Sequence, residues 1–270
     1  MARAARAAGY DVLGFSSHAP LVTPTPWAVP PERLEAYAAE IRRLRADWAE
    51  GGAEALLHGP MEILLGLEVD WYPGERAPGD GAFGSLALDY SIGSVHAVGT
   101  DGQGLFTIDG PADELDRAIA EKAGGEPERV WKAYYETLSR MIEAGGFDIL
   151  GHFDLVKKNN PGGRLFDEED PAYLAAAFEA AGLLEGKGIV AELNLGGLAR
   201  GKTKEPYPSL PILRELKRLR VPVTFCADAH DTRHVGVHLD AARELARAAG
   251  YESVAVLTKG SWIEVGIDET

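Results

Sequence analysis

The sequence is poor in cysteine, in long apolar runs and in basic charge. Cys226 is the only cysteine among 270 residues, so an intramolecular disulfide is impossible within this chain. Its place in an apolar run is typical of a small core residue. No apolar stretch is long enough to span a bilayer, and the first residues lack the apolar centre of a secretory signal. These absences lead us to expect a cytoplasmic protein with no membrane partner.

Basic residues are outnumbered by acidic ones. Lys and Arg number 27 against 42 Asp and Glu, which gives a formal net charge of −15. Such a surface repels nucleic acid and anionic membranes unless basic residues are concentrated locally. The sequence shows no basic stretch interleaved with aromatic residues, a pattern typical of single-strand binding. We therefore expect no nucleic-acid partner, which counts against a nuclease or a polymerase-associated domain.

Short apolar runs alternate with helical patterns along the whole chain. Strands are expected at residues 11–16, 62–67, 88–95, 147–151, 189–194 and 221–227, with two short closing strands within 253–265. Helices are expected at residues 1–9, 31–50, 111–123, 127–144, 171–184, 211–219 and 239–249. This alternation indicates an α/β fold with a parallel sheet. No repeat or break indicates a second domain, so we predict a single domain over residues 1–270.

Five of the apolar runs end on His, Glu or Asp. These endings are Ser16-Ser-His18, Gly66-Leu-Glu68, Gly93-Ser-Val-His96, Gly151-His152-Phe-Asp154 and Asp228-Ala-His230. Each one alone is explained by a helix cap or a surface histidine, but five together favour a shared site. Parallel α/β folds place their chemistry at the carboxyl ends of strands, and a closed barrel brings all those ends to one mouth. We therefore expect a barrel.

Imidazoles and carboxylates without thiolates suit zinc, manganese or iron. Glu68 could bridge two ions, and paired metals hold a hydroxide, polarise a phosphoryl oxygen and stabilise the leaving alkoxide. Two loops carry basic side chains that could bind phosphate oxygens. They are Lys157, Lys158, Arg164, Arg200, Lys202 and Lys204. For most of these six the ordinary interpretation is solvated surface.

The motifs, in this order, resemble those of the PHP (polymerase and histidinol phosphatase) family. The longer matches, at residues 66–74, 151–158 and 194–208, resemble the histidinol-phosphatase branch. The resemblance implies a distorted (β/α)7 barrel, similar to a TIM barrel, with a trinuclear metal site. It also implies the reaction: hydrolysis of a small phosphate monoester, namely histidinol phosphate to histidinol and phosphate in histidine biosynthesis.

The resemblance assigns metal ligands at the strand ends. They are His18, Glu68, His96, His152, Asp228 and His230. Glu68, His96 and His152 would hold one metal. Glu68 and Asp228 would share in a second, and His18 and His230 in a third.

The resemblance also assigns the substrate and catalytic residues. Arg200 stands where the family has a phosphate-binding arginine, but this loop carries one extra residue, so Lys202 is the alternative. The candidate catalytic residues are Asp154, Asp228 and His230. Asp154 would either orient a ligand histidine or act as an acid, and ligand support is the favoured role.

The sequence departs from the family at its start. Members open with a strand bearing His-x-His, whereas here a helical pattern at residues 1–9 comes first. We therefore expect the first strand and its two ligands to be absent, and fewer metal ions to bind. A barrel without that strand leaves two edges unpaired, which invites self-association. We expect this chain to be poorly active, and an upstream segment with the strand to raise metal content and turnover.

Two alternatives to the histidinol-phosphatase interpretation stay open. One is a catalytically impaired relative that retains the fold and one metal site. The other is a PHP phosphoesterase that acts on another small phosphate ester, since sequence does not determine the shape of the pocket.

Overall fold

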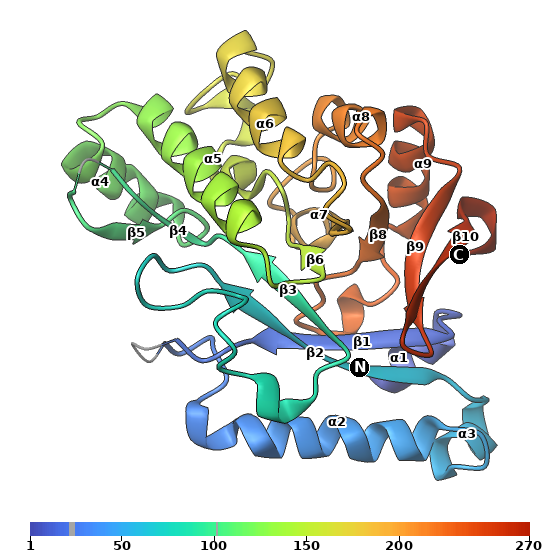
Figure 1. The fold of residues 1–270 in the computed structure, drawn as a ribbon. Helices are drawn as coiled ribbons and strands as arrows, with labels where there is room; N and C mark the ends of the chain where they lie inside the picture. The colour runs from blue at the N-terminus through green and yellow to red at the C-terminus, as the bar shows by residue number, and fades with distance from the viewer. Residues whose placement is uncertain (22–24, 101) are drawn as a thin grey trace.

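A computed structural model describes residues 1–21, 25–100 and 102–270. Six parallel strands form one curved sheet in the order β1-β2-β3-β6-β7-β8 (Figure 1). Their bounds are β1 (Val12–His18), β2 (Glu62–Asp70), β3 (Tyr90–Ser94), β6 (Ile149–Leu150), β7 (Val190–Asn194) and β8 (Val223–Cys226). The order follows the chain, as in a barrel, and the predicted α/β class is confirmed. Among the described residues the sheet is a half-barrel, because β1 and β8 each pair on one side only.

Helices cover the outer face of this sheet (Figure 1). Helix α2 (Leu34–Trp48) packs on β2, while α5 (Pro127–Ala144), α6 (Pro171–Gly182), α8 (Leu210–Arg218) and α9 (Leu239–Ala249) lie side by side over the rest. Residues 31–50 carry apolar side chains at three-and-four spacing, which predicts one buried helix face. Ala38, Ile41 and Trp48 of that face are buried in α2. Truncating a buried Trp48 to Ala would cost roughly 3–5 kcal/mol of folding free energy.

Further helices, 3₁₀ turns and a strand pair lie between these elements or at the ends of the chain. The remaining helices are α1 (Ala2–Ala7), α3 (Ala53–His58), α4 (Ala112–Lys122) and α7 (Gly196–Ala199). The 3₁₀ turns are η1 (Pro31–Arg33), η2 (Gly84–Leu86), η3 (Leu155–Asn159), η4 (Pro161–Gly163), η5 (Thr232–His234) and η6 (Ile267–Glu269). An antiparallel pair, β4 (Ala97–Gly99) and β5 (Leu105–Thr107), follows β3 and was not expected from the sequence.

A C-terminal hairpin lies against the inner face of the sheet. Strands β9 (Ser253–Thr258) and β10 (Ser261–Gly266) pair antiparallel, as the pattern around residues 259–260 predicts. Leu257 and Trp262 of this hairpin pack on a small inner cluster that contains Tyr90 and Ile149. The hairpin therefore helps to fill the interior of the half-barrel beneath the mouth.

Glycine at position 66 makes room for an aromatic ring on the inner face of the sheet. A Cβ at Gly66 would lie 2.5 Å from the ring of Tyr90, so only glycine lets that ring pack across the strand. Side chains two apart on a strand share a face, so Glu68 points into the same interior above Tyr90. Local sequence thus directs a carboxylate toward the mouth of the half-barrel.

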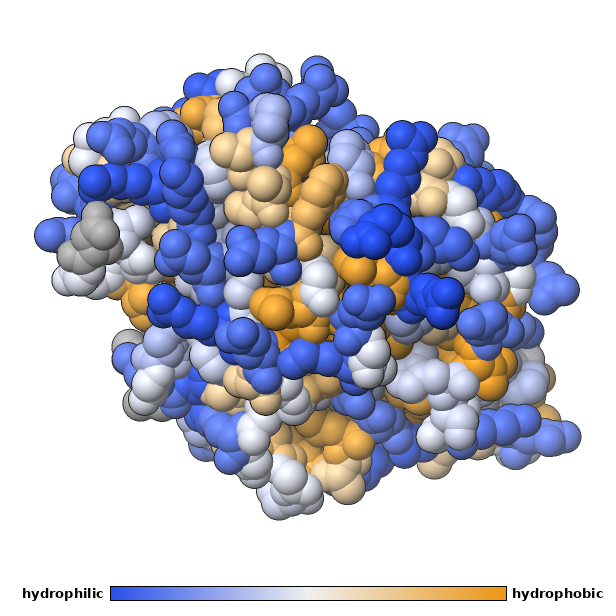
Figure 2. Space-filling model, turned by 45° about the horizontal axis from the view of Figure 1, so that its top comes forward, coloured by the Kyte–Doolittle hydropathy of each residue, from blue (hydrophilic) through white to orange (hydrophobic). Residues whose placement is uncertain are grey.

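The outer surface is hydrophilic on the face that Figure 2 brings forward, where apolar residues lie only in patches between polar ones. No helix in the described ranges is both long and apolar enough to cross a membrane. The single domain over residues 1–270 stays a prediction.

Candidate metal centre

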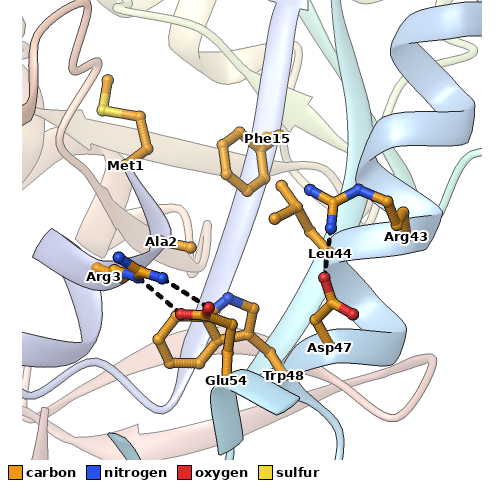
Figure 3. Close-up of a pocket in the computed structure, with 9 residues that line it drawn as sticks. All are labelled: Met1, Ala2, Arg3, Phe15, Arg43, Leu44, Asp47, Trp48 and Glu54. Carbon is orange, nitrogen blue, oxygen red and sulfur yellow. Dashed lines mark hydrogen bonds and ion pairs between the residues drawn. The ribbon is translucent and has the colours of Figure 1, made fainter. Parts of the chain in front are cut away.

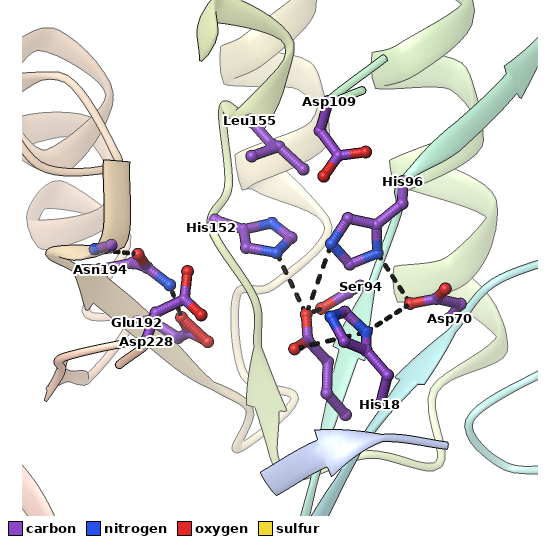
Figure 4. A network of polar contacts seen from close by, with 12 residues as sticks. His18, Asp70, Ser94, His96, Asp109, His152, Leu155, Glu192, Asn194 and Asp228 are labelled. Carbon is purple, nitrogen blue, oxygen red and sulfur yellow. Dashed lines mark hydrogen bonds and ion pairs between the residues drawn. The ribbon is translucent and has the colours of Figure 1, made fainter. Parts of the chain in front are cut away.

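Three histidines and two acidic residues meet at the carboxyl ends of neighbouring strands (Figure 4). We call them the histidine–carboxylate cluster: His18, Glu68, Asp70, His96 and His152. Sheet register sets His18 at the end of β1 directly opposite Glu68 of β2. Side-chain donor atoms of His18, Glu68, Asp70 and His96 all lie within 4.8 Å of one another. The strand ends predicted to converge do so.

Glu68 is the common partner of the cluster. Its Oε1 lies 3.1 Å from Nε2 of His152 and 3.6 Å from Nε2 of His96, and it accepts a hydrogen bond of 2.6 Å from the Ser94 hydroxyl. Asp70 binds the other side of His96, with 2.7 Å between Oδ1 and Nδ1. The two carboxylates therefore hold the His96 ring between them.

Burial and charge act in opposite directions on these groups. Burial disfavours the ionised form of Glu68, yet the positive charge on His18 and contacts with His152 and His96 hold its pKa well below the usual range. Asp70 is also buried, and the His96 charge with His18 contacts lowers its pKa to about 2. Burial lowers the pKa of His96, but Asp70 outweighs this and raises it to about 10. The contact with Asp70 thus favours the charged form of His96.

The donor set of the cluster fits a divalent metal ion. Nδ1 of His18 and Nδ1 of His152 are buried with no hydrogen-bond partner among the described residues. Imidazole nitrogens and carboxylate oxygens, with no thiolate, suit zinc, manganese or iron. A cation bound there would compensate the buried negative charges of Glu68 and Asp70.

A second group faces the cluster from the other side of the mouth. Arg200 Nη2 lies 2.9 Å from Asp228 Oδ2, while its Nη1 donates to the Asp228 carbonyl at 2.8 Å and lies 3.1 Å from His230 Nδ1. The ring centres of His230 and His18 are 6.5 Å apart. Asp228 has a φ of 44°, in the left-handed region that non-glycine residues rarely adopt. Such strain at a strand end is typical of a functional position.

Arg200 lies in the segment between β7 and α8, which we call the arginine loop (residues 195–209). In the same loop Lys202 is exposed, and no described contact joins its amine to Asp228. The geometry therefore favours Arg200 over Lys202 as the phosphate ligand, although the assignment stays a prediction.

The described contacts of Asp154 do not include the histidines of the cluster. It is fully buried, and its Oδ2 accepts a hydrogen bond of 2.9 Å from the Ser209 N–H and pairs with Lys157 Nζ at 2.9 Å. No described hydrogen bond joins its carboxylate to His152. The predicted role of Asp154 as an acid or a ligand support is therefore untested.

Sequence reasoning missed other carboxylates of the mouth. Asp70 was not expected, although its place two residues after Glu68 on β2 puts both on one face. Glu192 of β7 faces the cluster in Figure 4 and receives a hydrogen bond of 2.7 Å from the Asn194 amide. Burial raises the pKa of Glu192 to about 7 in spite of nearby His152. Its only sequence signal was a carboxylate near the end of an expected strand.

A family model described as the PHP domain matches residues 1–195. The chain belongs to the PHP domain family. A relative from Deinococcus radiodurans named "Probable histidinol-phosphatase" is 31% identical over 252 residues, which cover 92% of this chain and 86% of the relative. The histidinol-phosphatase of Bacillus subtilis is 28% identical over 248 residues, 86% of this chain and 87% of that protein.

Solved structures support the fold of this PHP chain. A crystal structure from Listeria monocytogenes superposes with a TM-score of 0.74 at 21% identity, covering 89% of this chain and 91% of that one. Histidinol phosphate phosphatase from Lactococcus lactis, solved with zinc, L-histidinol and phosphate, gives a TM-score of 0.62 at 20% identity, over 97% of this chain and 90% of that one. Both solved structures therefore share the mixed α/β fold of this chain.

Proposed function

We propose that this protein is a metal-dependent phosphate monoester hydrolase, and that histidinol phosphate is its substrate. One observation carries the proposal: a buried cluster of metal-type donors lies across a single mouth from an arginine, with 6.5 Å between the rings of His18 and His230. Metal donors opposite a guanidinium suit a phosphoryl group. The names of the curated relatives point to the same ester. Action in the cytoplasm, within histidine biosynthesis, is part of this proposal.

Residues on both sides of the mouth would bind the metal ions. The histidine–carboxylate cluster would hold a divalent ion, and Asp228 with His230 would contribute to further ions, two or three in all or fewer. Zinc, manganese or iron bound there would supply an activated hydroxide and stabilise the leaving oxygen.

The protein side chains would position the ester and move its proton. The Arg200 guanidinium would bind non-bridging phosphate oxygens in a charge-assisted, bidentate manner. Asp228 holds that guanidinium in place. His230 is largely exposed at the mouth. Where it holds no ion, it would donate a proton to the leaving alkoxide. Asp154, being buried behind the mouth, would act through its neighbours.

Phosphate release from histidinol phosphate tests the substrate assignment. The chain is supplied with zinc, manganese or iron in turn, and glycerol phosphate and a nucleoside monophosphate serve as comparison esters. We expect histidinol phosphate to be hydrolysed with the highest kcat/KM. Preference for another ester would favour a different PHP phosphoesterase. Metal binding without hydrolysis of any ester would favour the impaired relative.

We also propose that two copies of the chain associate through β1. Among the described residues β1 is an edge strand, and edges invite pairing. Beside it a pocket of about 400 Å³ opens between α1, α2 and α3, with Phe15, Leu44 and Trp48 on its apolar wall (Figure 3). Its rim carries both charge signs, in the pairs Arg3–Glu54 and Arg43–Asp47. A surface with both signs is complementary to a second copy of itself.

Sedimentation tests this association. We expect dimers in wild type, and monomers in Phe15→Glu, because a carboxylate on the apolar wall opposes burial of the edge. An equal distribution of species in the two proteins would contradict it. The charge of −15 further supports the inference that nucleic acid is not a partner.

A further inference from the structure

Lys157 is a buried lysine that the proposed chemistry does not use. It lies in η3, shortly after His152, and is only 4% exposed. The sequence pattern indicates a solvated basic loop here, and the structure corrects that expectation for Lys157. Burying an ammonium group costs free energy unless partners compensate its charge. The partners of Lys157 therefore reveal why it is inside.

Two carboxylates from different segments face the Lys157 amine. Its Nζ lies 2.9 Å from Asp154 Oδ2 and 3.0 Å from Glu205 Oε1. Asp154 stands at the start of the same 3₁₀ turn, where side chains three positions apart come together. Glu205 belongs to the arginine loop. Lys157 thus ties the segment that follows His152 to the loop that carries Arg200.

The arginine loop meets this buried pair at more than one point. Lys157 Nζ also donates to the Pro206 carbonyl at 3.4 Å and lies 5.5 Å from the centre of the Tyr207 ring. The Ser209 N–H donates to Asp154 Oδ2 at 2.9 Å. Residues 205–209 are therefore fastened to a single buried ion pair.

Close packing continues from this end of the loop to Arg200. Tyr207 exchanges backbone hydrogen bonds with Asn194. Its side chain lies so close to Gly197 that a Cβ there would be 2.7 Å from the ring atom Cε2 and from the hydroxyl oxygen. Gly197 belongs to α7, and Arg200 is the residue that caps this helix. Helix α7 is too short to be stable alone, so its position depends on the residues that pack against it.

We propose that Lys157 is a positioning residue, which together with Asp154 fixes the arginine loop so that Arg200 faces the phosphoryl group. Burial lowers the pKa of Lys157, but the charges of Asp154 and Glu205 raise it by more, so the amine stays protonated at neutral pH. The inference rests on the proposed function for the identity of the ligand, and on the contacts above for the fixing of the loop.

Limited trypsin digestion tests the fixing of the loop without any need for turnover. The arginine loop offers cleavage sites after Arg200, Lys202 and Lys204. Lys157→Met keeps the length of the side chain and removes its charge. Because a charge-assisted contact is lost, the loop should open locally more often. Trypsin should then cleave the loop at least about tenfold faster than in wild type. Lys157→Arg should restore much of the protection. Unchanged cleavage in Lys157→Met overturns the proposal.

Lys187→Met is the matched control for this digestion. The Lys187 amine also donates to backbone carbonyls, those of Ile142 and Glu143, but it lies outside the arginine loop. We expect wild-type cleavage in this variant. Equal acceleration in Lys187→Met and Lys157→Met would mean that loss of any tied lysine loosens the protein, and it would overturn a specific role for Lys157.

Calorimetric titration of the zinc-loaded protein with inorganic phosphate tests the link to Arg200. Lys157→Met and Arg200→Ala should each weaken phosphate binding. The double variant should bind no more weakly than Arg200→Ala alone, since both changes act through one guanidinium. Additive losses would overturn the proposal.

Two outcomes of these experiments are separated in advance. If Lys157→Met fails to fold, Glu205→Gln takes its place in both experiments. Glu205 is partly exposed, and without its charge the buried Lys157 amine still pairs with Asp154. If wild type binds no phosphate, the proposed function fails, while the trypsin comparison still decides whether Lys157 fixes the loop.

Discussion

The histidine–carboxylate cluster and the Arg200–Asp228–His230 group face each other across one mouth, yet they differ in the elements that carry them and in their exposure to solvent. Ordered strand ends supply the first, and its Glu68 side chain is 10% exposed. A loop and a strained strand end supply the second, and its His230 side chain is 59% exposed. The buried charges of the first group are held by one another, whereas the exposed groups of the second are freer to adjust to an ester. The comparison separates metal binding from phosphate binding.

The largest effect is expected when the shared carboxylate, Glu68, is neutralised. Glu68→Gln takes the charge from the residue that contacts His152 and His96. Loss even of supporting groups costs 10–100-fold in metal affinity, so loss of this direct ligand should cost about 100-fold or more. Competition with a chromophoric chelator measures it. Glu75→Gln, on an exposed loop, should bind metal as wild type does, and equal affinities for the two variants would contradict the cluster assignment.

A smaller effect is expected when the Arg200 guanidinium is removed. Arg200→Ala loses a charge-assisted contact worth roughly 1.5–3 kcal/mol, so phosphate inhibition and kcat/KM should weaken by about 10–150-fold. The metal held by the histidine–carboxylate cluster should stay at the wild-type level, because no described contact joins Arg200 to the cluster. Steady-state kinetics and elemental analysis together measure both quantities. Lys187→Ala should change neither, and a fall in metal content in Arg200→Ala would show that the two sides are not separable.

The smallest effect is expected at Lys202. Its exposed amine resembles a surface charge, whose contacts are worth about 0.2–1 kcal/mol, so Lys202→Ala should change phosphate inhibition by less than about fivefold. The same inhibition assay, run beside Arg200→Ala, gives the ratio of the two effects. A larger effect at Lys202 would transfer the phosphate-binding role to it.

Much of the fold followed from local pattern. The three-and-four spacing in residues 31–50 predicted α2, because burial of one helix face selects that spacing. Runs of apolar residues that stop at His18, Glu68 and His152 predicted the mouth, because parallel strands end at the same side. Residues 97–107 were not predicted as a hairpin, since strands of three residues are too short to show alternation.

What local pattern could not give were contacts between distant segments. Lys157 looked like surface because its second carboxylate, Glu205, comes from a loop whose path the sequence does not show. Asp70 was not predicted, because Glu68 alone already supplied an acidic residue at the end of that strand. The metal number and the roles of Asp154 and Asp228 depend on such distant geometry, and they stay predictions.

Removing and restoring the metal tests most directly whether turnover depends on metal bound by the histidine–carboxylate cluster. The protein is stripped with a chelator, zinc is added back in steps, and histidinol phosphate turnover is followed against zinc bound per chain. We predict that turnover is lost on stripping, returns in proportion to bound zinc in wild type, and does not return in Glu68→Gln at the same zinc concentrations. Turnover that survives stripping, or that returns equally in Glu68→Gln, would contradict a metal-dependent site built on this cluster.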